Sequence, residues 1–352
     1  MHDARIRRHA QILIEKCLEL KPGARVVITL TGPAGLPLAQ ECYRLIIRAG
    51  AEAAIRPAYT SLSWLFLHEA SDDALDQVPE PDLKLMEWAT ARITIDAPEA
   101  PEELPPMPDG ARMARRARAL APIVAATRKI AGPITAYPTA DLARRAGMTV
   151  GEYADFLYAA VDYDWTEMEN RLNAAMARFE GGDLVRLVAK DTDISFRIKD
   201  VPRFVSVGKG NMPSGEIYFS PVPDSTVGHI SYEWPCNWRG TQVEGVRLVF
   251  RGGKVVEATA EKNQAFLEAT LNTDEGARRL GEFGIGLNPY IQQYTNAILF
   301  DEKIGGSIHL ALGQAYGEGN QSHIHWDLIK DMRQSSEMYL DGKLIYRNGQ
   351  FL

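Results

Sequence analysis

The sequence predicts a two-domain protein of the α/β plus β class, with a largely parallel sheet in its first half and mainly antiparallel strands in its second. Its 352 residues exceed what one hydrophobic core normally serves, so about two domains are expected. Before residue 181, apolar strand-like segments alternate with segments of helical periodicity, which is typical of a parallel sheet. After it, short strand-like segments follow one another. We therefore expect an N-terminal α/β domain at residues 1–181 and a C-terminal β-rich domain at residues 182–352.

The first half alternates strand and helix patterns. Residues 25–30 are apolar and β-branched, which predicts a buried strand, and a helical segment and a second strand follow. A strand–helix–strand order favours parallel pairing. Strands are expected at residues 25–30, 52–57, 92–96 and 134–137, and helices at residues 4–20, 36–49, 63–90, 111–129, 139–146 and 149–179. The acidic, proline-rich segment at residues 98–108 is expected to form a surface loop or lid.

The second half is expected to contain short strands joined by tight turns. Glycines at residues 252–253 and 342 are typical of hairpin turns. Strands are expected at residues 184–189, 193–198, 217–219, 228–232, 243–250 and 254–260, and helices near residues 262–281 and 288–297.

Charge and cysteine content exclude several classes of protein. A net charge of −7 argues against a nucleic-acid partner, because binding to phosphates needs a basic surface. Cys17, Cys42 and Cys236 are far apart, which indicates a reducing compartment and excludes a disulfide scaffold or a cysteine-rich zinc site. No apolar run approaches the ~18 residues of a membrane helix, and no secretory signal is recognisable. We expect a cytoplasmic protein with no membrane partner.

Histidines and carboxylates gather at residues 300–331. His309, His323 and His325 lie there, together with Asp327. Imidazole and carboxylate groups are typical ligands of divalent transition metals. Because a strand sends alternate side chains to one face, His325 and Asp327 can point at one ion, and the same alternation leaves His323 open as a further ligand.

Two glutamates in glycine-rich segments are further candidates. Glu216 ends the segment GNMPSGE, and Glu282 lies in GEFGIGLNP. We interpret both segments as turns, and a turn backbone can aim a carboxylate into a cleft. Together with the histidine segment, they predict a metal site assembled in the second half of the chain.

Four motifs of the second half, taken in order, carry a family resemblance: NMPSGEIYFSP, LGEFGIGLNP, LFDEKIGGSIHLALGQAY and HIHWDLIKD. They resemble the metal-dependent aminopeptidase family typified by thermophilic aminopeptidase T and staphylococcal aminopeptidase S. The first half is similar to that family's opening domain in the segments LELKPGARVVI, RAGAEAAIRP and ITAYPTADLARRAGMTVGEYADFLYAAVDYDW. The closing segment YLDGKLIYRNGQFL is similar to the family's end, so the resemblance covers nearly the whole chain.

The resemblance implies a two-metal exopeptidase that acts on peptides with a free N-terminus and assembles as a homodimer. The metal ligands that it implies are Glu216, Glu282, Glu302, His309, His325 and Asp327. Two divalent ions, of Zn, Co or Mn, would activate a water and polarise the scissile carbonyl. Glu216 would also be the general base, and Tyr316 would donate a hydrogen bond to the oxyanion.

Two other functions fit part of the pattern. The ring-cleaving dioxygenases of the 2,5-dihydroxypyridine type are similar in overall sequence and use one Fe(II), for which His309, His325 and Asp327 would form a facial triad. Glu216 and Glu282 favour the peptidase, because a one-iron site has no need of them. A non-enzymatic, metal-stabilised binding protein would instead have a coordinatively closed site.

Overall fold

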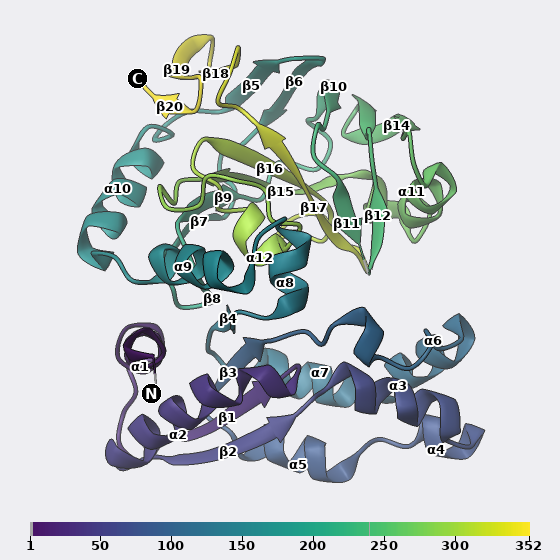
Figure 1. Cartoon of the computed structure of the whole chain (residues 1–352). Helices are drawn as coiled ribbons and strands as arrows, with labels where there is room; N and C mark the ends of the chain where they lie inside the picture. The colour runs from purple at the N-terminus through teal and green to yellow at the C-terminus, as the bar shows by residue number, and fades with distance from the viewer. Residues whose placement is uncertain (1–2, 239) are drawn as a thin grey trace. The chain divides into compact units, whose positions relative to one another are not determined.

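The computed structural model describes residues 3–238 and 240–352, which form two compact units (Figure 1). Unit 1 comprises Met1–Tyr163 and Gly208–Pro213, and unit 2 comprises Asp164–Val207 and Ser214–Leu352. Unit 1 contains a parallel sheet and unit 2 contains antiparallel sheets, so the predicted fold class is confirmed. The first boundary between the two compact units lies between Tyr163 and Asp164. The boundary expected at residue 181 lies just before the first strand of unit 2, which begins at Leu184.

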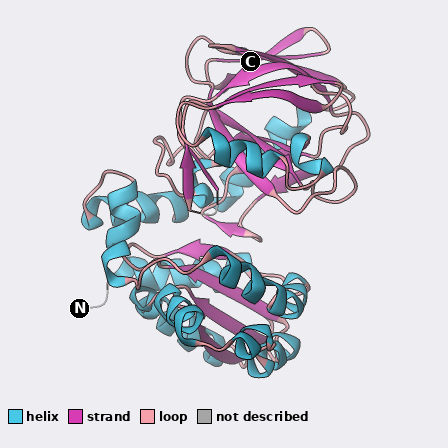
Figure 2. Cartoon of the chain, turned by 90° about the vertical axis from the view of Figure 1, so that its right-hand side faces the viewer, coloured by secondary structure: helices cyan, strands magenta, loops and turns pink. Residues whose placement is uncertain are grey.

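Unit 1 is built on a five-stranded parallel sheet with the order β2-β1-β3-β4-β8, flanked by helices (Figure 2). Val26, Val27 and Ile28 of β1 are fully buried, as expected of a parallel strand covered on both faces. The strands are β1 (Arg25–Leu30), β2 (Glu52–Pro57), β3 (Ala91–Asp96), β4 (Ile134–Ala136) and β8 (Asn211–Met212). The helices are α1 (Ala4–Gln11, continued by a π-helix at Ile12–Cys17), α2 (Leu36–Arg48), α3 (Thr60–Glu69), α4 (Asp72–Asp76), α5 (Glu80–Trp88), α6 (Gly110–Ala119), α7 (Ala121–Arg128), α8 (Ala140–Arg145) and α9 (Val150–Val161).

Several helices are shorter than the sequence pattern predicts. The segment expected as one helix at residues 149–179 divides into α9 and α10 (Trp165–Ala177), because the Asp164 side chain accepts hydrogen bonds from the first amides of a new helix. The segment at residues 63–90 forms α3, α4 and α5, with Ser71 capping α4. The segment at residues 111–129 forms α6 and α7, because Pro122 cannot continue the hydrogen bonding of the preceding helix. Among the described residues, no helix is long and apolar enough to cross a bilayer.

Unit 2 is built on two antiparallel sheets and a small hairpin. The larger sheet has eight strands in the order β14-β13-β10-β6-β5-β18-β19-β20, and the other has five in the order β17-β16-β15-β9-β7. The strands are β5 (Leu184–Ala189), β6 (Thr192–Arg197), β7 (Arg203–Ser206), β9 (Glu216–Phe219), β10 (Val227–Ser231), β11 (Cys236–Trp238), β12 (Thr241–Val243), β13 (Arg247–Arg251), β14 (Lys254–Thr259), β15 (Leu280–Gly286), β16 (Ser307–Gly313), β17 (His325–Asp331), β18 (Glu337–Leu340), β19 (Lys343–Arg347) and β20 (Gln350–Phe351). Its helices are α10, α11 (Gln264–Leu271) and α12 (Ile298–Asp301).

Two helices expected in unit 2 need correction. The segment near residues 262–281 forms α11 and a short 3₁₀ helix at Glu275–Arg278, and the chain becomes strand β15 from Leu280 onward. The prediction of a helix near residues 288–297 is wrong, because this segment consists of turns and bends. The carboxylate of Asp301 stabilises them by accepting hydrogen bonds from the backbone amides of Thr295 (2.7 Å) and Ala297 (3.0 Å). The strand expected at residues 243–250 is interrupted by Gly245, which has φ +64° and separates β12 from β13.

Aromatic rings form the core between the two large sheets of unit 2. Phe283 of β15 stacks on Phe219 of β9 with a centroid distance of 5.7 Å, and it meets Phe196 of β6 edge-on at 4.9 Å. These rings bury one face of the five-stranded sheet against the eight-stranded sheet, which leaves the other face of the five-stranded sheet for other side chains.

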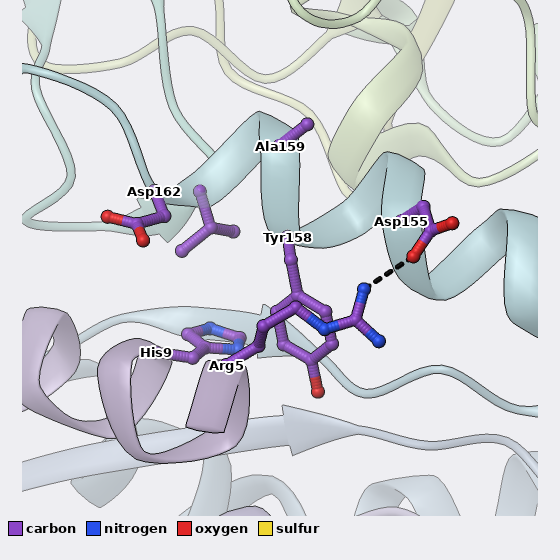
Figure 3. Close-up of a pocket in the computed structure, with 7 residues that line it drawn as sticks. Arg5, His9, Asp155, Tyr158, Ala159 and Asp162 are labelled. Atoms are coloured by element: carbon purple, nitrogen blue, oxygen red, sulfur yellow. Dashed lines mark hydrogen bonds and ion pairs between the residues drawn. The ribbon is translucent and has the colours of Figure 1, made fainter. Parts of the chain in front are cut away.

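A buried histidine lies in unit 1, beside a cavity of about 250 Å³ lined in part by Arg5, Asp155 and Tyr158 (Figure 3). His9 of α1 is only 1% exposed, and its Nε2 lies 2.8 Å from the hydroxyl oxygen of Thr135. Burial lowers the pKa of His9 from 6.5 to about 3, because the charged imidazolium is disfavoured away from water.

The His9 pKa predicts a loss of stability in acid. Below about pH 6.5 the unfolded chain binds a proton at His9 that the folded chain does not bind until about pH 3. In that window the free energy of unfolding should fall by about 1.4 kcal/mol per pH unit on account of His9 alone. A His9→Gln variant, which keeps a polar partner for Thr135, should lack this contribution. Urea unfolding of both proteins between pH 7 and pH 4 measures it, and two parallel stability curves would contradict the assignment.

Candidate metal centre

One face of the five-stranded sheet carries histidines and carboxylates. Ala311 of β16 lies opposite both Glu282 of β15 and Asp327 of β17, so these residues share a face. Positions two residues apart along a strand share that face as well. The functional side chains on it are Glu216 and Tyr218 of β9, Glu282 of β15, His309 of β16, and His325 and Asp327 of β17. Glu216 and Glu282 therefore lie on strands, which corrects the expectation that both lie in turns.

The carboxylate of Glu282 lies between the two histidines. Its Oε1 is 3.2 Å from Nε2 of His309, and its Oε2 is 3.2 Å from Nε2 of His325. Asp327 Oδ2 is 3.5 Å from the same nitrogen of His325, and Glu216 Oε2 is 3.7 Å from Nε2 of His309. One potential ligand atom from each of Glu282, His309 and Asp327 lies within 4.8 Å of the others, a spacing compatible with a shared ion.

A glycine in the neighbouring strand makes room for the His309 ring. Gly284 of β15 pairs with His309 of β16, and a Cβ atom at Gly284 would lie 2.0 Å from Nε2 of His309. No side chain fits at such a distance. The glycine at this position is therefore required by the ring that occupies the space above it.

The orientation of His325 is fixed by a backbone contact. Its Nδ1 lies 2.7 Å from the carbonyl oxygen of Gln314. A carbonyl can only accept, so Nδ1 carries the proton and donates it, which directs Nε2 toward Glu282 and Asp327. This is the arrangement commonly found in histidines that bind metals through Nε2.

The carboxylates favour the protonated form of both histidines. Burial lowers the pKa of His309, but the hydrogen bond to Glu282 and the charges of Glu282, Glu216 and Asp327 raise it to about 9. Burial also lowers the pKa of His325, and the charges of Asp327 and Glu282 raise it to about 12. Metal binding must therefore displace protons, so the affinity of this cluster for a metal ion should rise with pH.

Two buried carboxylate oxygens indicate that the cluster fits a cation. Glu216 Oε2 and Asp327 Oδ1 are buried and have no hydrogen-bond partner among the described residues. Buried acceptors are nearly always paired in folded proteins. A divalent ion held by imidazole nitrogens and carboxylate oxygens would supply the missing interaction, so these residues fit a transition-metal site.

A buried lysine also reaches the cluster. Lys303 follows α12, and its Nζ lies 3.2 Å from Glu216 Oε1. Glu302 pairs with the same ammonium through its Oε1. Glu302 is thus near Glu216, through their shared contact with Lys303.

Two tyrosines border the cluster. The ring of Tyr316, in the loop after β16, packs edge-on against the His325 ring at 5.1 Å and lies tilted against the Tyr218 ring at 5.2 Å. Burial raises the pKa of both hydroxyls, and the charge of Glu282 raises them further. Both tyrosines therefore remain protonated at neutral pH and able to donate hydrogen bonds.

A comparison with protein families identifies the chain. Residues 2–351 match the model of the thermophilic metalloprotease (M29) family. The chain belongs to the M29 family. The family resemblance carried by the four sequence motifs is therefore confirmed.

Aminopeptidases are among the curated relatives of this M29 chain. Aminopeptidase AmpS of Bacillus subtilis is 32% identical over 168 residues, and aminopeptidase T of Thermus aquaticus is 35% identical over 153 residues. The matched stretches span only 40% and 36% of the lengths of these two relatives, and 40% and 38% of this chain. A solved structure described as wild-type AmpT from Thermus thermophilus shares the fold, with a TM-score of 0.84, 22% sequence identity and 99% coverage of both chains.

The structure does not bring His323 to the cluster of Glu216, Glu282, His309, His325 and Asp327. Its Nδ1 lies 3.0 Å from Asp274 Oδ2, and its backbone amide donates to the same oxygen at 2.7 Å. Strand β17 begins only at His325, so strand alternation does not extend back to His323. Conversely, sequence reasoning missed Lys303 and Tyr218. Tyr218 stands two residues after Glu216 on one strand, and that spacing was a usable signal.

A Gly284→Ala variant should lose metal affinity because the added methyl group displaces the His309 ring. We expect the affinity for Zn²⁺ or Co²⁺ to fall about 10- to 100-fold, the usual effect of disturbing a ligand's support. Calorimetric titration of the protein, stripped of metal, with either ion measures it. Gly151→Ala is the matched control, because Gly151 lies in α9 with no atom within 4 Å of the added Cβ. Equal affinities in the two variants would contradict this role of Gly284.

Proposed function

We propose that the protein is a metal-dependent aminopeptidase that releases N-terminal residues from peptides. The observation that carries the proposal is the Glu282 carboxylate held between His309 and His325, beside Asp327, in a chain of the M29 family. The matched relatives named aminopeptidases support the same activity. These matches give no support to a ring-cleaving dioxygenase or to a non-enzymatic binding protein.

We assign the divalent metal to the residues that the geometry gathers. Glu282, His309, His325 and Asp327 offer nitrogen and oxygen ligands suited to Zn, Co or Mn. The family resemblance adds Glu216 and Glu302 as ligands and implies two ions. When bound, divalent metal supplies a Lewis acid that acidifies water and polarises a carbonyl group.

The chain's own residues have distinct roles in the proposed reaction. Burial raises the pKa of Glu216, against the opposing charge of Lys303, which makes its carboxylate a stronger base than that of an exposed glutamate. We assign it as the general base that accepts the proton of the attacking water. Tyr316, protonated and 45% exposed, is positioned to donate a hydrogen bond to the oxyanion that forms on the scissile carbonyl.

The acidic surroundings suit a substrate with a positive N-terminus. The negative charges of Glu282 and Asp327 would favour a peptide with a positively charged free α-amine, and recognition of that amine would restrict cleavage to the first residue. A homodimeric state and a cytoplasmic location stay predictions from the sequence.

Peptide hydrolysis tests the proposal directly. The purified protein should release free N-terminal amino acids from short unblocked peptides, and N-acetylated versions of the same peptides should stay intact. A chelator should abolish release, and added Zn²⁺, Co²⁺ or Mn²⁺ should restore it. Chromatography of the products over time gives the measurement. No release with any of the three ions would sink the proposal.

Glu216→Gln should abolish hydrolysis while leaving the fold intact. Loss of a general base lowers kcat about 10²- to 10⁴-fold, and Lys303 keeps Glu302 as a counter-charge in the variant. Steady-state kinetics and thermal unfolding together separate catalysis from stability. Glu233→Gln is the matched control, because Glu233 pairs with another buried lysine, Lys330, outside the cluster. Wild-type kcat in Glu216→Gln would remove Glu216 from the reaction.

A further inference from the structure

Lys303 places a buried positive charge inside the candidate centre, and the proposed reaction gives it no role. Its side chain is 0% exposed. Its Nζ lies 3.2 Å from Glu216 Oε1 and also contacts Glu302 Oε1. These two glutamates are the ones that the family resemblance adds to the histidine cluster as metal ligands.

The backbone holds Lys303 at this position. Gly286 of β15 pairs with Glu216, and a Cβ atom at Gly286 would lie 2.3 Å from the carbonyl oxygen of Ile304 and 2.8 Å from the carbonyl carbon of Lys303. The amide of Asn288 donates to the carbonyl oxygen of Lys303 at 3.1 Å. The chain therefore crosses the sheet directly over Gly286, which fixes the lysine next to Glu216.

The two carboxylate oxygens of Glu216 have different neighbours. Its Oε1 faces the Lys303 ammonium, whereas its Oε2 lies on the side of His309 and has no hydrogen-bond partner among the described residues. Glu282, in contrast, directs one oxygen toward each histidine. Direct contacts thus join Glu282 to the two histidines, and join the Lys303 ammonium to Glu216 and Glu302.

We infer that the Lys303 ammonium takes the place of a second metal ion, so that the centre binds one divalent ion. A dication bound by Glu216 Oε1 and Glu302 Oε1 would compete with the ammonium for the same oxygens. The ammonium and a dication bound to the same two carboxylates would repel each other strongly in a buried site. Lys303 acts as a positioning residue: it holds Oε1 of Glu216 and leaves Oε2 directed toward the ion at His309. This inference rests on the proposed metal site, and it disagrees with the two ions that the family resemblance implies.

The ion count per chain tests the inference. Protein stripped of metal, loaded with Co²⁺ and desalted, should retain about one ion per wild-type chain by elemental analysis. Lys303→Met removes the charge and should raise the count toward two, because the two glutamate oxygens that the ammonium contacts become available to a second ion. Lys303→Arg keeps the charge and should retain one ion.

Lys330→Met is the matched control for loss of a buried ammonium. Lys330 is also fully buried, and its Nζ pairs with Glu233 Oε1 at 2.6 Å. It lies on β17 but an odd number of positions from His325 and Asp327, on the opposite face of the sheet. This variant should unfold more easily than the wild type and bind the same number of ions.

Each outcome of the count decides the question. Two ions per wild-type chain would overturn the inference and leave the aminopeptidase proposal standing, and so would an unchanged count in a folded Lys303→Met variant. Failure of the wild-type protein to retain any ion would contradict both the one-ion inference and the proposed metal-dependent aminopeptidase. If Lys303→Met does not fold by circular dichroism, Co²⁺ titration of the wild type followed by visible absorption decides. Saturation at one equivalent supports the inference, and a second bound equivalent overturns it.

Discussion

The burial of several carboxylates on one face of a sheet is the constraint on which the rest of unit 2 depends. Glu216 and Glu282 are each only 4% exposed. A charge removed from water is tolerated only when an opposite charge or a strong hydrogen-bond partner lies close by. Glu282 meets this condition through two histidines and Glu216 through Lys303. The fold must therefore bring β9, β15, β16, β17 and the segment after α12 to one place.

Small residues make this convergence possible. On the site face, Gly284 leaves space for the His309 ring, and Gly286 leaves space for the backbone at Lys303. Glycine normally weakens a strand because it has no side chain to pack. Here β15 is paired on both edges, with β16 and β9, and its opposite face contributes Phe283 to the core. The ladder hydrogen bonds and the aromatic packing offset the weakness that the glycines introduce.

The sequence predicted the class of each half and named most of the histidines and carboxylates that the structure brings together, but not how these residues are supported. Strict period-two spacing brought His325 and Asp327 together as expected, because a strand leaves few alternatives. In β15, glycines alternate with the apolar residues Phe283 and Ile285, so the sequence lacks the usual apolar–polar pattern of a strand. The segment was therefore interpreted as the end of a helix followed by a turn. Lys303 could not be predicted, because its contact with Glu216 depends on a backbone crossing between segments about 90 residues apart, which no local pattern encodes.

The ligands and the proposed oxyanion donor are held in different ways, and this difference bears on catalysis. The proposed ligands Glu282, His309, His325 and Asp327 stand on strands whose register fixes them, which gives the precision that a metal site needs. Tyr316 lies in the loop beyond β16, where its carbonyl oxygen accepts a hydrogen bond from Ser220 (2.8 Å) and its ring packs on His325. The half-exposed ring thus rests against a proposed metal ligand. If the proposed roles hold, a displacement of His325 would disturb metal binding and oxyanion stabilisation together, because both depend on the contact between His325 and Tyr316.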